Sequence, residues 1–539
     1  MLAYFSAETT LKSSLTQREC TRGTYPPACG QPTSTTHPHL VKPGEVLPGI
    51  SLQELKRRRS KLVESVTLTA NTKNVHRQQI VVVPASSKVY MSDKIPYVFR
   101  QNTDFLYFSG CQEPDSILVL TCKEDKSSCT IFVRSRDEHS ELWDGPRTGV
   151  EMAIEVFGTD YALPITEFEH FLTSLIQEDK SSVVWYDHAD VVQPILHKKL
   201  CHLIKLTDNQ IFASPKILFH QIRLIKSARE VDLMRESCRI ASDAIVKTIQ
   251  SSKPGMSEHQ LFATVDYECR MHGAEYLAYP HVVAAGRNAN VIHYINNSQI
   301  IQSGDLVLMD AGLYRGAYNY DQYEIETFSH LYPLAGCEYH GYSSDITRTW
   351  PINGKFTPEQ KVLYEIVLDV QKHLIESLKK MPSLDNAFRH MCFLLGERLQ
   401  EINVIPKDID ENKLLAAAYA YCPHHVSHYL GMDVHDTGKI SRSIRIQPGM
   451  IITMEPGTAR SVIFILKERI CKLIHVAFYC IRCVHKSEDS LRTVTLSWLR
   501  NSYRGRYFNN RKWSGSLDEK LPEGVSGDRS SSKLKIKDV

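Results

Sequence analysis

Several features that would place a chain outside the ordinary globular class are missing from this sequence. No stretch reaches the roughly 18 uninterrupted apolar residues of a membrane span. The nearest candidate, residues 461–484, is interrupted by charged residues, among them Lys467, Lys472 and Arg482. There is no large excess of one charge either, because 64 Lys and Arg against 61 Asp and Glu leave a net charge of +3. We therefore expect no membrane anchor and no nucleic-acid partner.

A regular cysteine framework is also missing. The 14 cysteines are scattered over 539 residues, which predicts free thiols in a reducing compartment and not a disulfide scaffold. Cys480 and Cys483 form one CxxC pair beside His485. A single pair without a second one is weak evidence for zinc, so we do not predict a zinc site in this region.

The chain is long enough for two or more domains, and its composition changes along its length. Residues 1–40 are rich in Ser, Thr and Pro, and we expect a disordered leader there. This leader is compatible with organelle targeting, although Glu8 and Glu19 are unusual in such segments. Residues 41–218 alternate a helical stretch, Leu52–Val66, with short β-branched runs, which predicts an α/β domain. The predicted strands are Ile80–Val83, Ile117–Thr121, Thr130–Val133 and Val183–Tyr186.

A second domain is predicted over residues 219–457, and capping signals mark its helices. Ser227 and Glu230 have the spacing of a capping box, and Ser257 precedes a helical pattern over residues 258–271. Thr357 followed by Pro358 predicts the start of a long helix that reaches about residue 380. Residues 458–539 form a basic tail whose end is poor in apolar side chains, so we expect it to be partly disordered.

Acids at the ends of predicted strands are the first candidates for chemistry. Asp310 ends an apolar run just before Ala-Gly, and Glu455 ends another just before Pro-Gly. Each strand would bring a carboxylate to the edge of a cleft. In an extended segment Asp345 faces the same side as Ser343 and Thr347.

Histidines lie between these acids in the sequence, with His428 and His435 in one short segment and His424 just before it. Carboxylates combined with one imidazole suit Mn or Co better than a thiolate site would. Two such ions could share a water, lower its pKa and polarise a peptide carbonyl. Strand-end acids are also typical of turns and caps, and lone histidines of hydrogen-bonded core positions. Spacing alone leaves both interpretations open.

Residue strings extend this pattern to a known family. Asp310–Gly312 (DAG), Ser344–Pro351 (SDITRTWP), His428–Asp436 (HYLGMDVHD) and Pro448–Gly457 (PGMIITMEPG) resemble the signatures of the aminopeptidase P family, and of its mitochondrial branch in particular. Further similarity in the N-terminal part includes Gln112–Leu120 (QEPDSILVL) and Glu141–Arg147 (ELWDGPR).

The resemblance implies an α/β fold in which a creatinase-like N-terminal domain precedes a pitta-bread metallopeptidase domain. The implied activity is hydrolysis of the bond between an N-terminal residue and a following proline, usually with two Mn²⁺ ions, with Co²⁺ or Zn²⁺ as alternatives. Peptides with N-terminal X-Pro would be the substrates. A homodimer in mitochondria is implied, with the cytoplasm as the alternative location.

By motif, the resemblance also implies four metal ligands and three histidines that act on the substrate. Asp310 would bind one ion, Asp345 would lie on the bridging side, and His293 would help to hold the reacting carbonyl. The ligands are Asp310, Asp345, His428 and Glu455, and the catalytic histidines are His293, His424 and His435.

Two departures from the family pattern bear on activity. A 24-residue insert, 313–336, separates Asp310 from Asp345, and the family's closing Arg-x-Glu motif has no match after Gly457, so the catalytic domain looks truncated at its C-terminal end. An alternative function is therefore a catalytically impaired pitta-bread protein that acts as a binding module. A dipeptidase of the prolidase kind is a further alternative, which the N-terminal similarity disfavours.

Overall fold

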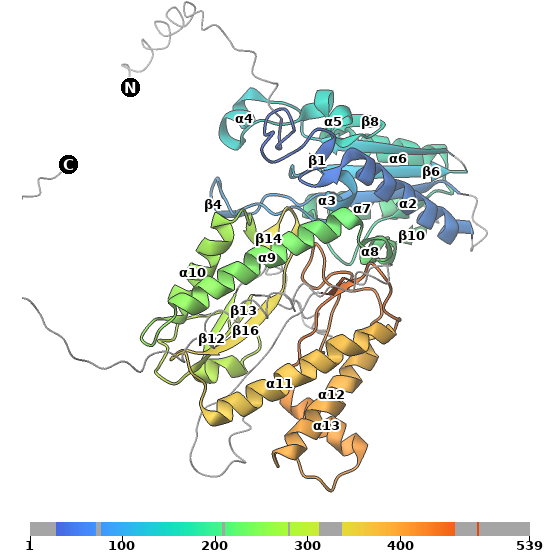
Figure 1. The fold of residues 1–539 in the computed structure, drawn as a ribbon. Coiled ribbons are helices and arrows are strands. Elements are labelled where there is room, and N and C mark those ends of the chain that lie inside the picture. Colours follow the sequence, from blue (N-terminus) through green and yellow to red (C-terminus); the bar gives the residue numbers. More distant parts are fainter. Residues whose placement is uncertain are drawn as a thin grey trace, which may run out of the picture. The chain divides into compact units, whose positions relative to one another are not determined.

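The computed structural model describes residues 29–71, 77–124, 126–206, 211–278, 281–311, 337–458 and 482–483 (Figure 1). The predicted insert, the first 28 residues of the leader, and the tail apart from residues 458 and 482–483 lie outside these residues. From residue 29 onward the leader contacts the first domain, since Gln31 donates hydrogen bonds to the carbonyls of Val46 and Gly110. None of the described helices has the length and apolar character of a membrane span.

A six-stranded mixed sheet forms the N-terminal domain. Its strands are β3 (Gln79–Pro84), β6 (Ile117–Lys123), β7 (Lys126–Val133), β8 (Tyr161–Pro164), β9 (Val183–Trp185) and β10 (Ile211–Ala213), and their order is β10-β9-β3-β6-β7-β8. Its helices are α2 (Leu52–Asn71), α3 (Thr103–Ser109), α4 (Glu138–Asp144), α5 (Gly149–Phe157), α6 (Phe168–Glu178) and α7 (Pro194–Leu206). The four predicted strands and the predicted helix are confirmed.

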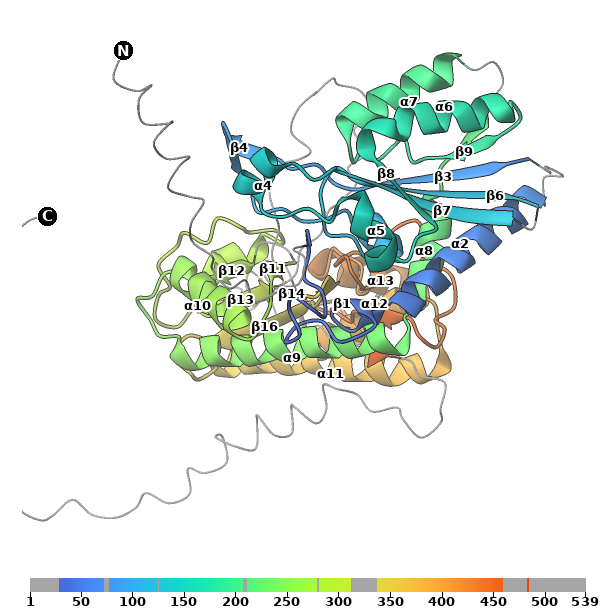
Figure 2. The ribbon, with the colours of Figure 1, turned by 90° about the horizontal axis from the view of Figure 1, so that it is seen from above.

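Alternation of side chains along the strands gives this sheet two buried faces. In β3, Ile80 and Val82 pack into a cluster with α6 and α7, whereas Val81 and Val83 pack into a second cluster with α2. Figure 2 shows α6 and α7 on one side of the sheet and α2 on the other. Two minor strand pairs and one 3₁₀ turn complete the first domain: β1 (Glu45–Leu47) with β2 (Ile50–Ser51), β4 (Tyr90–Ser92) with β5 (Ile95–Pro96), and η1 (Ile165–Glu167).

The second domain combines small antiparallel sheets with long helices. Its strands are β11 (Tyr276–Leu277), β12 (Val282–Ala285), β13 (Leu306–Ala311), β14 (Cys337–Tyr339), β15 (Tyr342–Ser343), β16 (Ile346–Pro351), β17 (Ile451–Ile452) and β18 (Arg482–Cys483). Its helices are α8 (Lys216–Leu224), α9 (Ala228–Ser251), α10 (Glu258–Met271), α11 (Pro358–Ser377), α12 (Leu384–Glu401) and α13 (Glu411–Tyr421), with 3₁₀ turns η2 (Gly286–Asn290) and η3 (Leu378–Lys380). The sheets have the orders β12-β13-β16, β11-β14-β15 and β17-β18.

Capping fixes where the long helices begin, as the sequence predicts. Ser227 and Glu230 form a capping box at the start of α9, and Ser257 does the same with Gln260 at α10. Thr357 caps α11 with Pro358 in its first turn. Each box satisfies backbone N–H groups that have no partner inside the helix.

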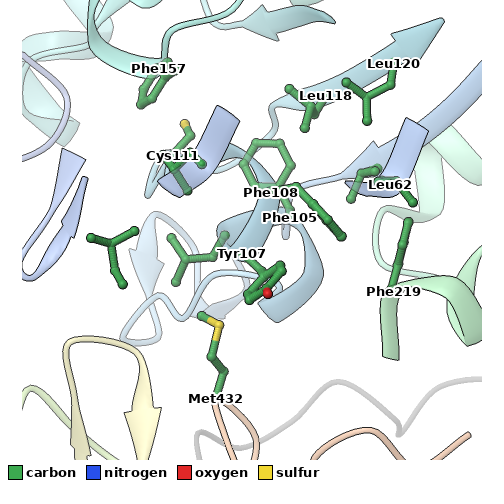
Figure 3. Close-up of a cluster of buried hydrophobic side chains, with 14 of the residues drawn as sticks. Leu62, Phe105, Tyr107, Phe108, Cys111, Leu118, Leu120, Phe157, Phe219 and Met432 are labelled. Atoms are coloured by element: carbon green, nitrogen blue, oxygen red, sulfur yellow. The ribbon is translucent and has the colours of Figure 1, made fainter. Parts of the chain in front are cut away.

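One hydrophobic cluster crosses from the first domain into the second. Figure 3 shows Tyr107 and Phe108 of α3 beside Phe219 of α8 and Met432 of the His428–Asp436 segment. The HYLGMDVHD segment therefore rests on a core that the N-terminal domain helps to build.

Candidate metal centre

Antiparallel register places two of the predicted ligands on one face of a sheet. Asp310 in β13 pairs with Thr347 in β16, and Asp345 comes directly before β16. Residues 345 and 347 point to the same face, so Asp345 is the diagonal neighbour of Asp310, about 7–8 Å away in such pairs. The hydroxyl of Thr347 donates a 2.7 Å hydrogen bond to Oδ1 of Asp310 and orients that carboxylate.

A short backbone ladder brings the other two ligands together. The N–H of Glu455 donates to the carbonyl of Val426, and the N–H of Thr453 donates to the carbonyl of His428. The hydroxyl of Ser427 also donates to the carbonyl of Thr453. These hydrogen bonds hold the segment that carries His428 beside the segment that ends in Glu455.

Asp345, His428 and Glu455 form a compact group in which one ligand atom from each lies within 4.8 Å of the others. Nε2 of His428 is 3.2 Å from Oδ2 of Asp345 and 2.8 Å from Oε1 of Glu455. The Nδ1–H of His428 donates to the carbonyl of Tyr429, which directs the Nε2 atom toward the two acids. An imidazole fixed by a backbone carbonyl in this way is the usual arrangement of a metal-binding histidine.

The charge balance of this group fits a divalent cation. Burial lowers the pKa of His428, but the nearby charges of Glu455 and Asp345 outweigh burial and raise it to about 10. The site thus attracts positive charge, and Oε1 of Glu455 is buried without a well-aligned hydrogen bond from the described residues. Two atoms about 2.1 Å from one ion and at right angles to each other are about 3.0 Å apart. The observed separations match that value.

The other predicted residues surround this group without joining it. The carboxylate of Asp310 lies outside the group of three and is held by Thr347. His435 lies against His428, with ring centroids 4.2 Å apart. Burial, together with the charges of His428, Arg442 and His293, lowers the pKa of His435 to about 2. Burial and the charge of His424 also lower the pKa of His293. His293 therefore lies within the electrostatic influence of His424 and acts in turn on His435.

A buried charge network that the sequence does not predict contacts the HYLGMDVHD segment through Asp433 and Asp436. Arg223 of α8 donates to Asp104 of α3 at 2.6 Å, to Asp433 at 2.7 Å and to Asp436. Lys226 donates to Oδ2 of Asp436 at 2.8 Å. The sequence contains Arg223 and Lys226 in the string RLIKS, but it does not show which carboxylates these two cations contact.

Close packing in this network requires a glycine. A Cβ atom on Gly431 would lie 2.4 Å from Oδ2 of Asp436 and 3.1 Å from Cε of Lys226. Gly431 therefore lets the segment that carries His428 and His435 come close to its anchor.

The comparisons with known proteins agree with this geometry. The sequence profile of the aminopeptidase P N-terminal domain matches residues 55–185, and that of metallopeptidase family M24 matches 232–326 and 334–477. Human "Xaa-Pro aminopeptidase 3" is 41% identical over 441 residues, which cover 79% of this chain and 80% of that protein. The chain belongs to the aminopeptidase P family.

Two further proteins match similar shares of the chain. "Intermediate cleaving peptidase 55, mitochondrial" of Arabidopsis thaliana is 36% identical over 431 residues, covering 79% of this chain and 77% of that protein. The structure of zinc-substituted Escherichia coli aminopeptidase P in complex with product superimposes with a TM-score of 0.69 at 29% identity. It covers 83% of this chain and 96% of the bacterial one. The predicted family and fold class are confirmed, and the protein is a metallo-aminopeptidase that depends on a divalent metal.

Proposed function

We propose that this metallo-aminopeptidase removes the N-terminal residue from peptides with proline in second position, using two Mn²⁺ ions at the centre described above. The observation that carries the proposal is the buried group of Asp345, His428 and Glu455, in which Nε2 of the histidine and two carboxylates face one point. Asp310 extends the site along the same sheet face. An oxygen-rich set with one imidazole favours Mn over softer metals.

When bound by these residues, divalent ions would lower the pKa of a water and polarise the scissile carbonyl. The residues of the chain itself supply the proton transfer and the hydrogen bonds to the peptide. A carboxylate of the centre takes up the proton that leaves the attacking water and delivers it to the proline nitrogen as the peptide bond breaks. His293 and His435 lie beside the centre and can donate hydrogen bonds to the peptide. Burial, together with neighbouring positive charges, lowers the pKa of both imidazoles and so favours the uncharged form, which does not repel a cation.

The alternative of a catalytically impaired binding module is not favoured, because a pure binding module would not need these ligands. The M24 match continues to residue 477 and is interrupted only over 327–333, inside the predicted insert. The acids that follow the last matched motif, Glu468 and Glu488, lie outside the described residues.

The direct test is Mn²⁺-dependent cleavage of a peptide that begins X-Pro, with a matched X-Ala peptide as the control. We expect cleavage of the first peptide only, activity that chelation removes and Mn²⁺ restores, and two ions per chain by atomic absorption. Folded, Mn²⁺-loaded protein that leaves the X-Pro peptide intact would contradict the proposal.

A homodimer is the second part of the proposal, supported by an exposed apolar patch, here called the α4 patch. The charge pair between Lys88 and Asp144, at 2.7 Å, joins the end of α4 to the β4–β5 hairpin. The exposed fractions are 80% for Leu142 and 74% for Trp143. The name α4 patch denotes the exposed apolar residues of α4 and of the segment around the β4–β5 hairpin, which are Leu142, Trp143, Tyr90, Met91 and Val98. Apolar patches of this kind mark contacts with another protein surface.

Replacing Trp143 with glutamate should weaken the homodimer. A buried tryptophan at an interface contributes about 2 kcal/mol or more, which is about 30-fold in the dissociation constant. Sedimentation equilibrium measures the constant directly. Leu68→Glu is the matched control, because Leu68 is 68% exposed on α2, away from the patch, and should leave association unchanged. Equal constants for Trp143→Glu and the unaltered chain would exclude the α4 patch as the interface.

Mitochondria are the proposed location. Support comes from the leader composition and from the name of the Arabidopsis relative, which places that protein in mitochondria. Fractionation of cells with an antibody against the chain would separate this from the cytoplasmic alternative.

A further inference from the structure

A buried cysteine lies directly behind one of the active-site histidines. Cys422 ends α13, is fully buried, and has its Sγ atom 3.4 Å from Nε2 of His424. The other ring nitrogen of His424, Nδ1, is 3.1 Å from the carbonyl oxygen of His425. Both nitrogens of this imidazole are therefore engaged by the protein itself.

The partners of the two nitrogens determine where the protons are. A carbonyl oxygen only accepts, so Nδ1 of His424 must carry a proton. Burial raises the pKa of the Cys422 thiol, but the neighbouring charge of His424 and the backbone N–H groups of Gly457 and His424 outweigh burial and lower that pKa. A thiol beside a cationic imidazole is stabilised as a thiolate, and Nε2 then donates to it across the 3.4 Å contact. Burial lowers the pKa of His424, but the contact with Cys422 and the charge of Glu455 outweigh burial and raise it to about 10.

We propose that Cys422 is a positioning residue that, as a thiolate, holds His424 as an imidazolium in a fixed orientation beside the metal centre. A protonated imidazole has no free lone pair, so His424 in this pair neither binds metal nor acts as a base. It acts as a fixed positive charge beside the substrate. This inference rests on the proposed function.

The pair is tested by a double-mutant cycle with Cys422→Ala, His424→Ala and the double variant, all loaded with Mn²⁺ and assayed on the X-Pro peptide. Loss of a residue that orients an active-site group costs about 10- to 100-fold. We expect such a loss in kcat/KM for Cys422→Ala, and a double variant no worse than His424→Ala, because Cys422 acts only through that imidazole. Cys392→Ala is the matched control: Cys392 is also buried, on the neighbouring helix α12, and its loss should leave kcat/KM unchanged.

A second measurement needs no activity. The ultraviolet absorption of a thiolate should be present in the metal-free unaltered chain at neutral pH, and absent from both Cys422→Ala and His424→Ala. Additive effects in the cycle, unchanged kcat/KM in Cys422→Ala, or no thiolate absorption would overturn the inference. An unaltered chain that shows the thiolate but does not cleave the X-Pro peptide would instead contradict the proposed function and leave the Cys422–His424 pair standing.

Discussion

Replacing Asp345 with asparagine should lower kcat/KM on an X-Pro peptide by more than about 100-fold. Loss of a residue that merely supports a metal ligand already costs 10- to 100-fold, and Asp345 is a proposed ligand itself. The substitution keeps the shape of the side chain but removes one of the two carboxylates that face Nε2 of His428. The amide binds a divalent ion far more weakly, so metal content should fall together with activity. Steady-state kinetics and atomic absorption on the same preparation measure both.

Asp410→Asn is the matched control for this prediction. Asp410 caps α13, and asparagine caps helices equally well, so the same chemical change should have no effect there. If Asp345→Asn kept both its metal and its activity while the control behaved normally, the proposed centre would be wrong. If it kept the metal but lost activity, Asp345 would act on the reaction without being needed to bind the ion.

Replacing Arg223 with methionine should lower the free energy of unfolding by about 3–5 kcal/mol. The guanidinium is 3% exposed and contacts three carboxylates, of which Asp104 and Asp436 are also buried. Removing one partner of a buried ion pair leaves uncompensated charge, which accounts for a cost of this size. Urea denaturation of the metal-free protein measures the change. Arg239→Met is the control, because Arg239 is half exposed on α9 and its pairs should contribute about 0–1 kcal/mol. Similar losses of unfolding free energy in both variants would show that the buried network contributes no more to stability than an exposed ion pair does.

Low pH should weaken the same charge network and so lower the stability of the fold. Burial raises the pKa of Asp104, but the charges of Arg223 and Lys216 outweigh it and lower the pKa below the ordinary value of 3.8. A carboxyl whose pKa is lower in the folded state stabilises the fold above its unfolded pKa, and the contribution is lost as pH falls toward the folded value. We therefore expect stability to decline below about pH 4, and the decline to be shallower in Arg223→Met.

Local signals were sufficient to predict much of the fold. Serine or threonine caps with glutamate or glutamine three residues on fixed the starts of α9, α10 and α11 to the residue. Apolar runs that end in an acid located the strand of Asp310 and the segment that ends in Glu455. In both cases the physical cause acts over a few neighbouring residues, so the sequence displays it directly.

Contacts between distant segments could not be predicted in this way. Asp104 and Arg223 are 119 residues apart and meet only because α3 and α8 pack together. Cys422 likewise resembled any other scattered cysteine, since its bond to His424 depends on side-chain direction. The grouping of Asp345, His428 and Glu455 came from family motifs, not from spacing.

The paired register of β13 and β16 has a consequence for the unusual length between Asp310 and Asp345. Six consecutive residue pairs, from Leu306↔Pro351 to Ala311↔Ile346, hold the two strands together. Lengthening a connection between such paired strands costs chain entropy that grows with the logarithm of its length, about 0.6 kcal/mol per doubling. Residues can therefore be added between the two strands at a small cost in free energy, while the strand pairing keeps both carboxylates in position.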